Sequence, residues 1–442
     1  MNVLLVSTYD LGRQPFGLAS PAAWLSERGH QVLCADLCID ALNPDRVREA
    51  DLVAFYLPMH TATRLAAKVI EKVRALNPAA HICCYGLYAP LNESYLRGIG
   101  ADTILGGEFE AGLVSLLERL AAKSTLHQTE PLISLHRLQF RVPLRSGLPP
   151  LEKYAHLQIE GMSKRAGYTE ASRGCKHLCR HCPVVPVYQG NFRVVQPEVV
   201  LADVRQQVAA GAEHITFGDP DFFNGPTHAM RILDALHREW PRITYDATIK
   251  IEHLLKHRDL LPRLRDTGCR FVTSAGESVD DRVLERLDKG HTRADFIEVV
   301  REFRSIGLTL APTFIPFTPW TTPQSYRELL ELLAELDLVE HVAPVQLALR
   351  LLIPHGSRLL ELDDVQAVVR AFDQPALLYR WQHPNPEVDA LASQALRIAS
   401  SRGSRREIFA SLWNLVSPRS LFEDVDLLPR TAIPYLDEPW FC

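Results

Sequence analysis

The 442-residue sequence lacks the features of several protein classes. It has no run of the roughly 18 apolar residues that a membrane-spanning helix needs, so no membrane partner is expected. Its start lacks the basic stretch and long apolar run of a secretory signal peptide. The 48 Lys and Arg nearly balance the 53 Asp and Glu, so the composition does not favour nucleic acid as a partner. We therefore expect a cytoplasmic protein.

The nine cysteines are an odd number, and a reducing cytosol disfavours disulfides. Four of them lie in the first hundred residues, next to apolar segments, where small core side chains are expected. One stands alone at position 269. The remaining four are a tight group of three and the final residue of the chain: Cys175, Cys179, Cys182 and Cys442.

The first part of the chain alternates short apolar segments with amphipathic ones, which predicts a doubly wound parallel sheet with helices on both faces. Ligands of such sheets bind beyond the carboxyl ends of the strands. No Gly-x-Gly-x-x-Gly occurs, so the fingerprint of a dinucleotide fold is missing. The expected strands are residues 2–7, 32–37, 52–57, 82–85 and 103–105, and the expected helices are 21–28, 63–76 and 110–120.

Three short motifs in this part resemble the cobalamin-binding-like domain that precedes many radical enzymes. They are residues 15–18 (Pro-Phe-Gly-Leu), 29–32 (Gly-His-Gln-Val) and 106–110 (Gly-Gly-Glu-Phe-Glu). The resemblance implies this fold for residues 1–124. The family's Asp-x-His-x-x-Gly motif, which supplies a cobalt ligand, is absent. Two readings stay open: a domain that binds cobalamin without the His, and a domain that keeps the fold and binds no corrin.

Residues 125–160 contain several Pro, Ser and Gly and no sustained period, which predicts a linker. Beyond it, the group of three cysteines has the spacing C-x3-C-x2-C. Three thiolates on one loop can hold three corners of an iron–sulfur cube and leave one iron open, because no fourth Cys follows at a regular spacing. The alternative is a zinc site completed by His177 or His181.

Strand-like and helix-like segments alternate around this motif and predict six β/α units over residues 161–354. Six units form a partial TIM-type barrel, whose chemistry belongs at the carboxyl ends of the strands. The expected strands are 168–172, 214–217, 243–248, 270–274, 308–314 and 344–349, and the expected helices are 197–210, 227–240, 252–267, 280–287, 293–306 and 325–338. Residues 355–442 are expected to form a mainly helical C-terminal segment, with helices at 364–371, 386–402 and 405–415.

The cysteine spacing resembles that of the radical S-adenosylmethionine (SAM) superfamily. The resemblance implies that a 4Fe–4S cluster on Cys175, Cys179 and Cys182 binds the amino and carboxylate groups of SAM through its open iron. His181 stands where the family usually has an aromatic residue before the third Cys.

Loops after later strands extend the resemblance. The segment of Gly218, Asp219 and Pro220 is similar to the family's loop that receives the methionyl amino group, although Asp and Gly also occur in ordinary turns. Residues 275–278 (Ala-Gly-Glu-Ser) resemble the family's Gly-x-Glu-Ser, which implies that Glu277 faces the cofactor, whereas Ser278 fits a helix cap equally well. Arg350 either points into the same mouth or pairs with a surface acid.

The whole chain also resembles the CUAEP/CCAEP-tail radical SAM subgroup, on residues 353–361, 379–384 and 438–442. That subgroup has a second Cys or selenocysteine where this chain stops at Cys442. The resemblance implies a catalytic role for Cys442 and a reading frame that continues through a selenocysteine codon. A natural stop is the alternative.

These patterns predict an enzyme that uses a 4Fe–4S cluster to cleave SAM and modify a small-molecule substrate, with an external electron donor of the flavodoxin or ferredoxin type. One rival is cobalamin-dependent methyl transfer. Another is transfer of the 3-amino-3-carboxypropyl group to a soft acceptor such as trivalent arsenic. A rival of a different class is a non-catalytic iron–sulfur redox or metal sensor.

Overall fold

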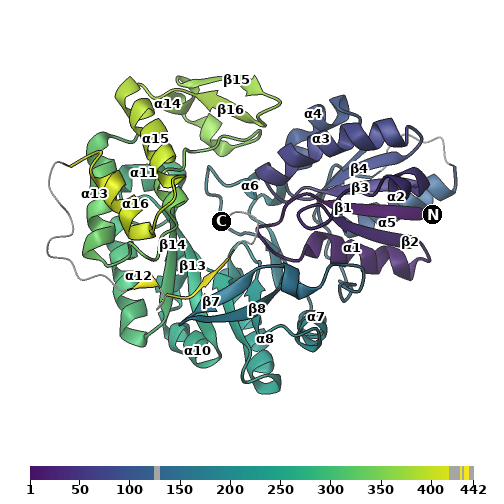
Figure 1. The fold of residues 1–442 in the computed structure, drawn as a ribbon, viewed down its shortest axis with the longest axis horizontal. Helices are drawn as coiled ribbons and strands as arrows, with labels where there is room; N and C mark the ends of the chain where they lie inside the picture. Colours follow the sequence, from purple (N-terminus) through teal and green to yellow (C-terminus); the bar gives the residue numbers. More distant parts are fainter. Residues whose placement is uncertain (124–129, 418–428, 431–432, 438–442) are drawn as a thin grey trace.

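The computed structural model describes residues 1–123, 130–417, 429–430 and 433–437. These residues form two α/β bodies that lie side by side, each built on its own sheet (Figure 1). The two sheets meet with the carboxyl ends of their parallel strands facing the centre of the molecule (Figure 1). None of the described helices combines the length and the apolar character needed to cross a membrane.

The N-terminal sheet is fully parallel and has the strand order β2-β1-β3-β4-β5-β6. Its central strands are apolar and buried on both faces, as expected for a sheet that is covered on both sides. The last strand lies in the segment expected to be a linker. The strands are β1 Asn2–Ser7, β2 Gln31–Asp36, β3 Leu52–Tyr56, β4 His81–Tyr85, β5 Thr103–Gly107 and β6 Ile133–Ser134.

Helices cover both faces of this sheet and give it two apolar cores. The helices α1 and α5 pack on one face, and α2, α3 and α4 pack on the other (Figure 1). The helices are α1 Phe16–Glu27, α2 Pro44–Glu49, α3 His60–Leu76, α4 Glu93–Gly98 and α5 Glu110–Ala121, with a 3-10 turn η1 at Pro90–Asn92.

Helix α1 begins five residues before the expected start at Pro21. A proline inside a helix has no N–H for the carbonyl four residues earlier. Here that carbonyl belongs to Gly17, and it accepts a 2.8 Å hydrogen bond from the Tyr85 hydroxyl instead. Because the Gly17 carbonyl has this other donor, the helix can continue through Pro21 and need not begin at it.

The barrel sheet has the order β14-β13-β12-β11-β8-β7-β17. Strands β8 and β11 to β14 are parallel and form a curled half-barrel, while β7 and β17 extend one edge antiparallel. The strands are β7 His156–Ile159, β8 Met162–Thr169, β11 His214–Phe217, β12 Thr244–Thr248, β13 Cys269–Glu277, β14 Thr309–Phe314 and β17 Tyr435–Leu436. The linker expected at residues 125–160 contains β6 of the N-terminal sheet, the 3-10 turn η2 at Leu151–Lys153 and β7 of the barrel sheet. It therefore belongs partly to each sheet.

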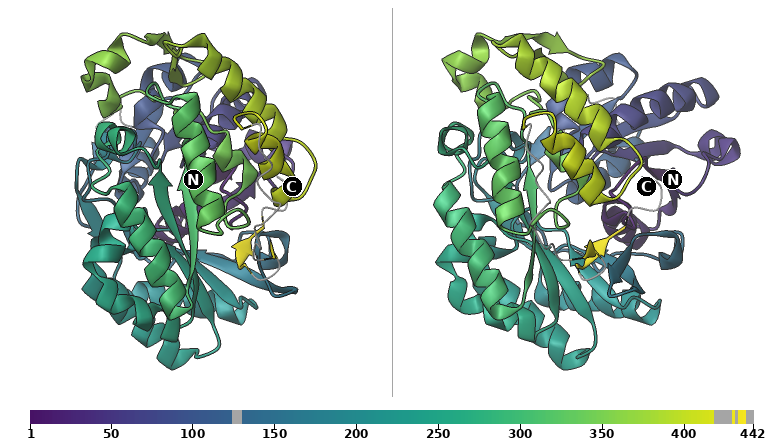
Figure 2. Two further views of the ribbon diagram at one scale, coloured as in Figure 1. Left: turned by 90° about the vertical axis from the view of Figure 1, so that its left-hand side faces the viewer. Right: turned by 60° about the vertical axis from the view of Figure 1, so that its left-hand side comes forward.

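The helices between these strands lie on the outside of the half-barrel (Figure 2). Most follow the predicted ranges, but the single helix predicted at 252–267 is divided into α9, η4 and α10. Helix α12 illustrates the local reasons: Thr292 and Asp295 form a capping box at its start, and Gly307 ends it with a φ of +68°. The helices are α7 Pro197–Ala209, α8 Pro226–Glu239, α9 Ile251–Lys256, α10 Leu261–Asp266, α11 Asp281–Leu287, α12 Arg293–Ile306 and α13 Pro323–Glu335; the shorter 3-10 turns are η3 Phe222–Asn224 and η4 Arg258–Leu260.

The partial barrel is confirmed, but the prediction of a sixth strand at residues 344–349 is wrong. This segment forms the 3-10 helix η5, Pro344–Leu347, and only a single parallel bridge joins Phe317 to Arg350 beyond it. Proline is well placed at the first position of a helix, and short apolar runs do not distinguish a strand from a helix by periodicity. The amide of Phe314 in β14 finds its acceptor in the Gln346 side chain.

The C-terminal segment also departs from the prediction at residues 364–371. Helix α14, Asp363–Gln366, stops early, and strand β15, Val369–Asp373, pairs antiparallel with β16, Leu378–Trp381. Val369 pairs with Trp381, a β-branched residue opposite an aromatic one, which stabilises a hairpin. The later helices agree with expectation: α15 Pro386–Ala399 and α16 Arg405–Trp413, preceded by the 3-10 turn η6 Arg358–Glu361.

Candidate cofactor site at the mouth of the barrel

The three thiols of the C-x3-C-x2-C motif lie on a loop that starts at the mouth of the half-barrel. The loop follows β9, Ser172–Gly174, which pairs antiparallel with β10, Phe192–Val194, and leads into the short helix α6, Val185–Tyr188. Gly174 has a φ of +74°, and a Cβ on it would lie 2.5 Å from the Asn191 carbonyl oxygen. Only glycine fits this entrance to the loop.

The spacing of the thiols argues against a single metal ion. The sulfur atoms of thiolates on one zinc ion lie about 3.8 Å apart, because the Zn–S bond is about 2.3 Å long and the geometry is tetrahedral. Within the described part of the chain, the one group of three ligand atoms that all lie within 4.8 Å of one another contains no Cys. The zinc alternative for Cys175, Cys179 and Cys182 therefore has no support, whereas three thiolates around a larger cluster remain consistent with the structure.

Burial sets the protonation of these thiols. Desolvation raises the pKa of Cys182 to about 12, and it also raises the pKa of Cys175. A buried thiol of this kind becomes a thiolate when a metal takes the place of its proton. The donor set thus fits an iron–sulfur cluster that assembles with loss of protons.

Glu277 is held beside this loop. It ends β13 with a φ of +62°, and its Oε1 lies 3.0 Å from Nε2 of His181 and 3.3 Å from Nζ of Lys289. Burial alone would raise the pKa of Glu277, but Lys289 and His181 outweigh it and hold the pKa at about 2. Among the described residues, the hydrogen bonds and ion pairs of this carboxylate reach Oε1 and none reaches Oε2. An ionised carboxylate with one free oxygen next to the cysteine loop can accept a hydrogen bond from a cofactor ammonium.

Asp219 has a different environment from the one expected. Its Oδ2 accepts a 2.9 Å bond from the Ala171 amide, and its Oδ1 accepts a 2.5 Å bond from the Ser172 hydroxyl. Burial raises the pKa of Asp219 to about 7. The side chain therefore braces the entrance of the cysteine loop against β11. Its neighbour Gly218 allows a close approach, since a Cβ there would lie 1.8 Å from the Tyr168 hydroxyl.

Of the other residues expected to contact the cofactor, Pro220 lies at the mouth of the barrel, whereas Ser278 and Arg350 have other partners. Pro220 lines the same cavity as Gly218. Ser278 accepts a 3.1 Å bond from the Asp280 amide and so belongs to the turn before α11. Arg350 takes the surface alternative: its guanidinium donates to Asp389 at 2.6 Å and lies 3.6 Å from the Trp381 ring centroid, which corrects its placement in the mouth.

A cavity of about 180 Å³ lies between the two sheets. Tyr56 and Phe109 line it from the N-terminal body, and Tyr168 lines it from the barrel. Pockets for drug-sized ligands span about 300–1,000 Å³, and a corrin is larger than such ligands. The described residues of the lining include no His that could bind cobalt. In this arrangement the cavity is smaller than a corrin, so cobalamin would bind only without a His ligand and with Tyr56, Phe109 and Tyr168 moved apart.

Buried ion pairs join the two bodies next to the cysteine loop. Arg173 in β9 donates to Glu110 of α5 through both terminal nitrogens, at 2.7 and 3.0 Å, and its Nε donates to Glu170 at 2.7 Å. Glu108 lies 3.3 Å from the same guanidinium. Burial raises the pKa of Glu108 to about 7 in spite of Arg173. Helix α6 packs into the same core as β1, β3 and β4, so the N-terminal body covers the cysteine loop.

Sequence reasoning did not single out Arg173 and Lys289. Lys289 lies in the Asp-Lys-Gly-His run that follows α11, and its buried ammonium contacts Glu277. Lone basic residues carry no local signal of burial. A tertiary contact twelve residues back along the chain makes Lys289 part of the site.

The end of the chain returns to the barrel. Strand β17 pairs with β7 (Figure 2). Asp437 accepts bonds from the His156 amide at 2.6 Å and from the Gln158 side chain at 2.7 Å. Cys442 lies outside the described residues. Its catalytic role, the continuing reading frame and the CUAEP/CCAEP-tail subgroup stay predictions.

Comparison with known proteins places the motif in a family. Residues 169–333 match the model of the Radical SAM superfamily. The hopanoid C-3 methylase of Methylococcus capsulatus is 25% identical over 335 residues, which cover 72% of this chain and 64% of that protein. A tRNA-2-methylthio-N(6)-dimethylallyladenosine synthase of Thermus thermophilus is 24% identical over 66% of this chain and 61% of its own. The chain thus spans less than two thirds of the length of these relatives.

Two solved structures share the fold over most of the chain. The radical SAM methyltransferase TsrM from Kitasatospora setae, with tryptophan and a SAM analogue bound, superposes with a TM-score of 0.69 at 16% identity and covers 91% of this chain and 90% of that one. The cobalamin-dependent SAM radical enzyme OxsB, with aqua-cobalamin and SAM bound, gives 0.70 at 13% identity over 92% and 70%. Residues 169–333 are therefore a radical SAM domain, the domain of an enzyme superfamily, within a chain that has the fold of these two enzymes.

Proposed function

We propose that Cys175, Cys179 and Cys182 hold a 4Fe–4S cluster and that the chain binds SAM and modifies a small-molecule substrate. The observation that carries this proposal is the loop itself: three thiols at the carboxyl ends of the barrel strands, beside the ionised Glu277. Bound there, the cluster would supply the electron that cleaves SAM reductively.

The chain's own residues would bind and shield. Lys289 and His181 keep Glu277 ionised, so that its Oε2 can accept from the ammonium of SAM. Gly218 lets the backbone after β11 approach a ligand closely, while Asp219 fixes the start of the cysteine loop. The packing of α6 against the N-terminal core excludes water from one side of the loop.

Methyl transfer is the second candidate function. It is supported by the similarity to the hopanoid C-3 methylase and by the fold shared with TsrM. Cobalamin as the methyl carrier would require Tyr56, Phe109 and Tyr168 to move apart, because the cavity that they line is smaller than a corrin. Transfer of the 3-amino-3-carboxypropyl group and a sensor function are the remaining alternatives, and no contact in the described structure favours either.

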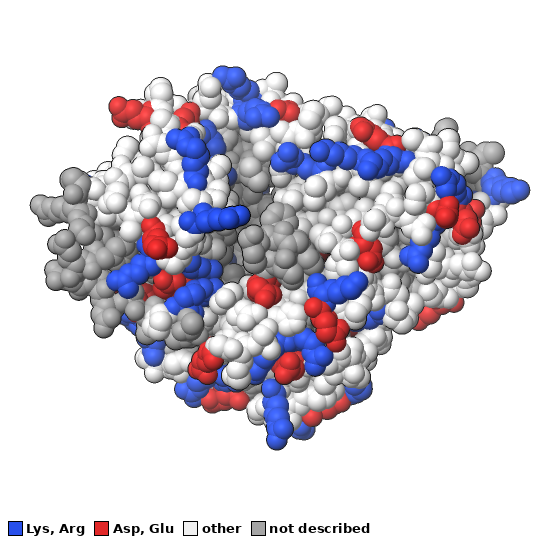
Figure 3. All heavy atoms as spheres, viewed as in Figure 1, with Lys and Arg blue, Asp and Glu red and all other residues white. Residues whose placement is uncertain are grey.

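We further propose a cytosolic location and a one-electron donor of the flavodoxin or ferredoxin type. All eight described cysteines are free thiols, which suits a reducing compartment. Lys and Arg are interspersed with Asp and Glu on the face drawn in Figure 3, which favours a small molecule over nucleic acid as substrate.

The test is anaerobic reconstitution with iron and sulfide, reduction, and mass spectrometry of the SAM products. We expect 5′-deoxyadenosine. S-Adenosylhomocysteine would instead favour methyl transfer, methylthioadenosine would favour transfer of the 3-amino-3-carboxypropyl group, and unchanged SAM would support a sensor.

A paired variant tests the binding role. Glu277→Gln should weaken SAM binding about tenfold or more, because a charge-assisted hydrogen bond contributes about 1.5–3 kcal/mol, and it should leave the iron content unchanged. The matched control is Glu239→Gln, which removes a carboxylate from an exposed pair on α8. Equal SAM affinity in the two variants would remove Glu277 from the site.

A further inference from the structure

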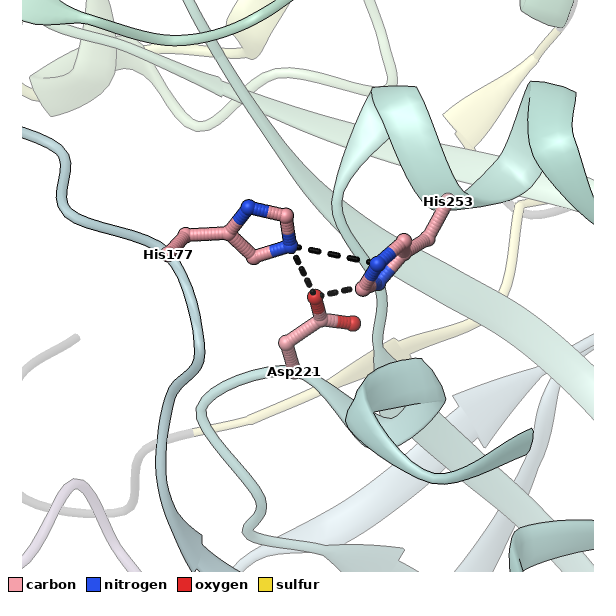
Figure 4. Close-up of side chains that lie close together, drawn as sticks. All are labelled: His177, Asp221 and His253. Carbon is pink, nitrogen blue, oxygen red and sulfur yellow. Dashed lines mark hydrogen bonds and ion pairs between the residues drawn. The ribbon is translucent and has the colours of Figure 1, made fainter. Parts of the chain in front are cut away.

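Two histidines and an aspartate converge beside the cysteine loop (Figure 4). His177 lies on that loop, between Cys175 and Cys179. Asp221 follows β11, and His253 lies on α9. Segments from three different parts of the chain thus bring one ligand atom each to a common point, all within 4.8 Å of one another.

The distances suit ligands of one metal ion. Nε2 of His177 lies 3.2 Å from Nε2 of His253 and 3.5 Å from Oδ2 of Asp221. Tetrahedral zinc with bonds of 2.0–2.1 Å places its ligand atoms about 3.3 Å apart. Nδ1 of His253 is closer to Oδ2 of Asp221, at 2.6 Å.

Burial makes the arrangement costly unless something binds there. The side chains of Asp221 and His253 are 3% and 1% exposed. Oδ2 of Asp221 and Nδ1 of His253 form the 2.6 Å ion-pair contact with each other, but neither atom makes a hydrogen bond among the described residues. Buried polar atoms without a hydrogen bond are rare in native structures, and an ion is one of the explanations for them.

Neighbouring groups orient the side chains of Asp221 and His177. Oδ1 of Asp221 accepts a 3.2 Å bond from the Phe223 amide, which leaves Oδ2 turned towards the histidines. On the far side of His177, Nδ1 lies 3.1 Å from Nζ of Lys250 and 3.6 Å from Oε2 of Glu252. In this arrangement Nδ1 accepts from the Lys250 ammonium, which also donates to Glu252 at 2.9 Å. Metal-binding histidines commonly donate their other N–H to a carboxylate, and an ion on Nε2 would move the ring proton to Nδ1, where Glu252 is the neighbouring carboxylate that could accept it.

We propose that His177, Asp221 and His253 bind one divalent transition-metal ion of the zinc type, separate from the cluster. Two imidazole nitrogens and a carboxylate oxygen are a usual ligand set for zinc, with water in the fourth position. The ion would fasten the middle of the cysteine loop to β11 and α9. Its role is to hold the loop in place whether or not iron is bound.

The test uses the full-length chain with Cys175, Cys179 and Cys182 all replaced by Ser, so that no cluster thiol competes. After loading with Zn²⁺ and desalting, elemental analysis should find one zinc per chain. In this background, His177→Ala and His253→Ala should each weaken zinc at least a hundredfold in competition with a chromophoric chelator. Co²⁺ should give visible absorption without a thiolate-to-metal band.

The matched control is His257→Ala, which removes another histidine whose ring centroid lies 5.9 Å from that of His253. It should keep the zinc. Glu252→Gln should lower the affinity for zinc about 10–100-fold, as loss of a supporting carboxylate does. Because His177 is partly exposed, its variant should fold, which circular dichroism checks.

Zinc that persists in both His177→Ala and His253→Ala, or a cluster-free chain that binds no zinc, would overturn the proposal. Reconstituted chain without the Ser replacements supplies an independent readout. In this cysteine-containing chain, His177→Ala should lose zinc and keep its iron. Missing zinc in the parent chain would count against this site, whereas missing iron would count against the cluster assignment.

Discussion

The barrel and the N-terminal body present the same edge of a parallel sheet to the centre of the molecule, but with opposite chemistry. The barrel edge carries thiols, histidines and the ionised Glu277. The N-terminal edge is closed by aromatic rings: Tyr85 lies with its ring centroid 5.6 Å from that of Tyr56 and 4.9 Å from that of Phe109. The same edge of two parallel sheets thus differs in what it can bind, because the side chains at the strand ends decide it.

Two buried carboxylates make the contrast quantitative. Glu277 has a pKa of about 2, because Lys289 and His181 overcome the effect of burial. Glu108 has a pKa of about 7, because burial and the nearby Glu110 outweigh Arg173. Glu277 is thus held ionised at the barrel edge, whereas Glu108 at the N-terminal edge is held closer to its neutral form. The following experiments test these differences.

The largest effect is expected at the thiols. Replacing Cys175, Cys179 and Cys182 together by Ala should abolish iron binding and the brown chromophore, because the motif offers no other soft ligands. Iron analysis after anaerobic reconstitution measures this. Cys34→Ala, in β2 of the N-terminal sheet, is the control and should keep the iron. A triple variant that still held about four irons per chain would refute the assignment.

Next in size is the junction between the two bodies. Arg173→Met leaves three buried carboxylates without their cation, which should lower the free energy of unfolding by about 3–5 kcal/mol. Urea denaturation measures it. The control Arg28→Met breaks an exposed pair with Glu118 and should cost about 0–1 kcal/mol. Similar losses in the two variants would show that the junction contributes no more than a surface pair.

The two carboxylates should respond to pH in opposite directions. The folded pKa of Glu277 lies below its ordinary value of 4.5, so its contribution to stability is present above pH 4.5 and is lost as the pH falls towards 2. The folded pKa of Glu108 lies above 4.5, so its contribution is present below pH 4.5 and is lost as the pH rises through 7. Each shift corresponds to a change on the order of 3 kcal/mol.

Urea denaturation of iron-free protein across pH separates these contributions. Glu277→Gln should reduce the pH dependence of the free energy of unfolding only between pH 4.5 and 2. Glu108→Gln should reduce it only between pH 4.5 and 7. If both variants flatten the same side, the opposite electrostatics of the two edges is wrong.

A smaller effect is expected at the entrance of the cysteine loop. Gly174→Ala forces a side chain into a left-handed backbone conformation against the Asn191 carbonyl, at a cost of about 1–3 kcal/mol. Gly147→Ala is the control, since a Cβ there meets nothing within 4 Å. Thermal unfolding compares them, and equal melting temperatures would show that the loop entrance relaxes freely.

The smallest effect is expected when cobalamin is added to the protein. Because Tyr56, Phe109 and Tyr168 line the cavity between the sheets, hydroxocobalamin should neither bind nor raise the melting temperature. TsrM, whose structure contains cobalamin, is the positive control for the titration. Stoichiometric binding would mean that the rings move apart and that the two edges are more alike than their packing indicates.

Local patterns predicted much of the fold and part of the site. The strand at His214–Phe217 and the helix at Arg293–Ile306 have the ranges that periodicity and capping indicate. The cysteine spacing and the Gly-Glu-Ser at the end of β13 indicated the mouth of the barrel. The segment 344–349 was misread, because a short apolar run with proline at its start has no period that separates a strand from a 3-10 helix.

Partners far apart in the chain were beyond such patterns. Asp219 binds Ala171 and Ser172, nearly fifty residues earlier, and Arg350 binds Asp389. The same holds for the convergence of His177, Asp221 and His253, none of which is near another in the sequence. The sequence by itself determined where strands, helices and thiols occur, since these depend on neighbours along the chain. Only the tertiary structure decided which charges meet, because that depends on how loops dock across the ends of the sheets.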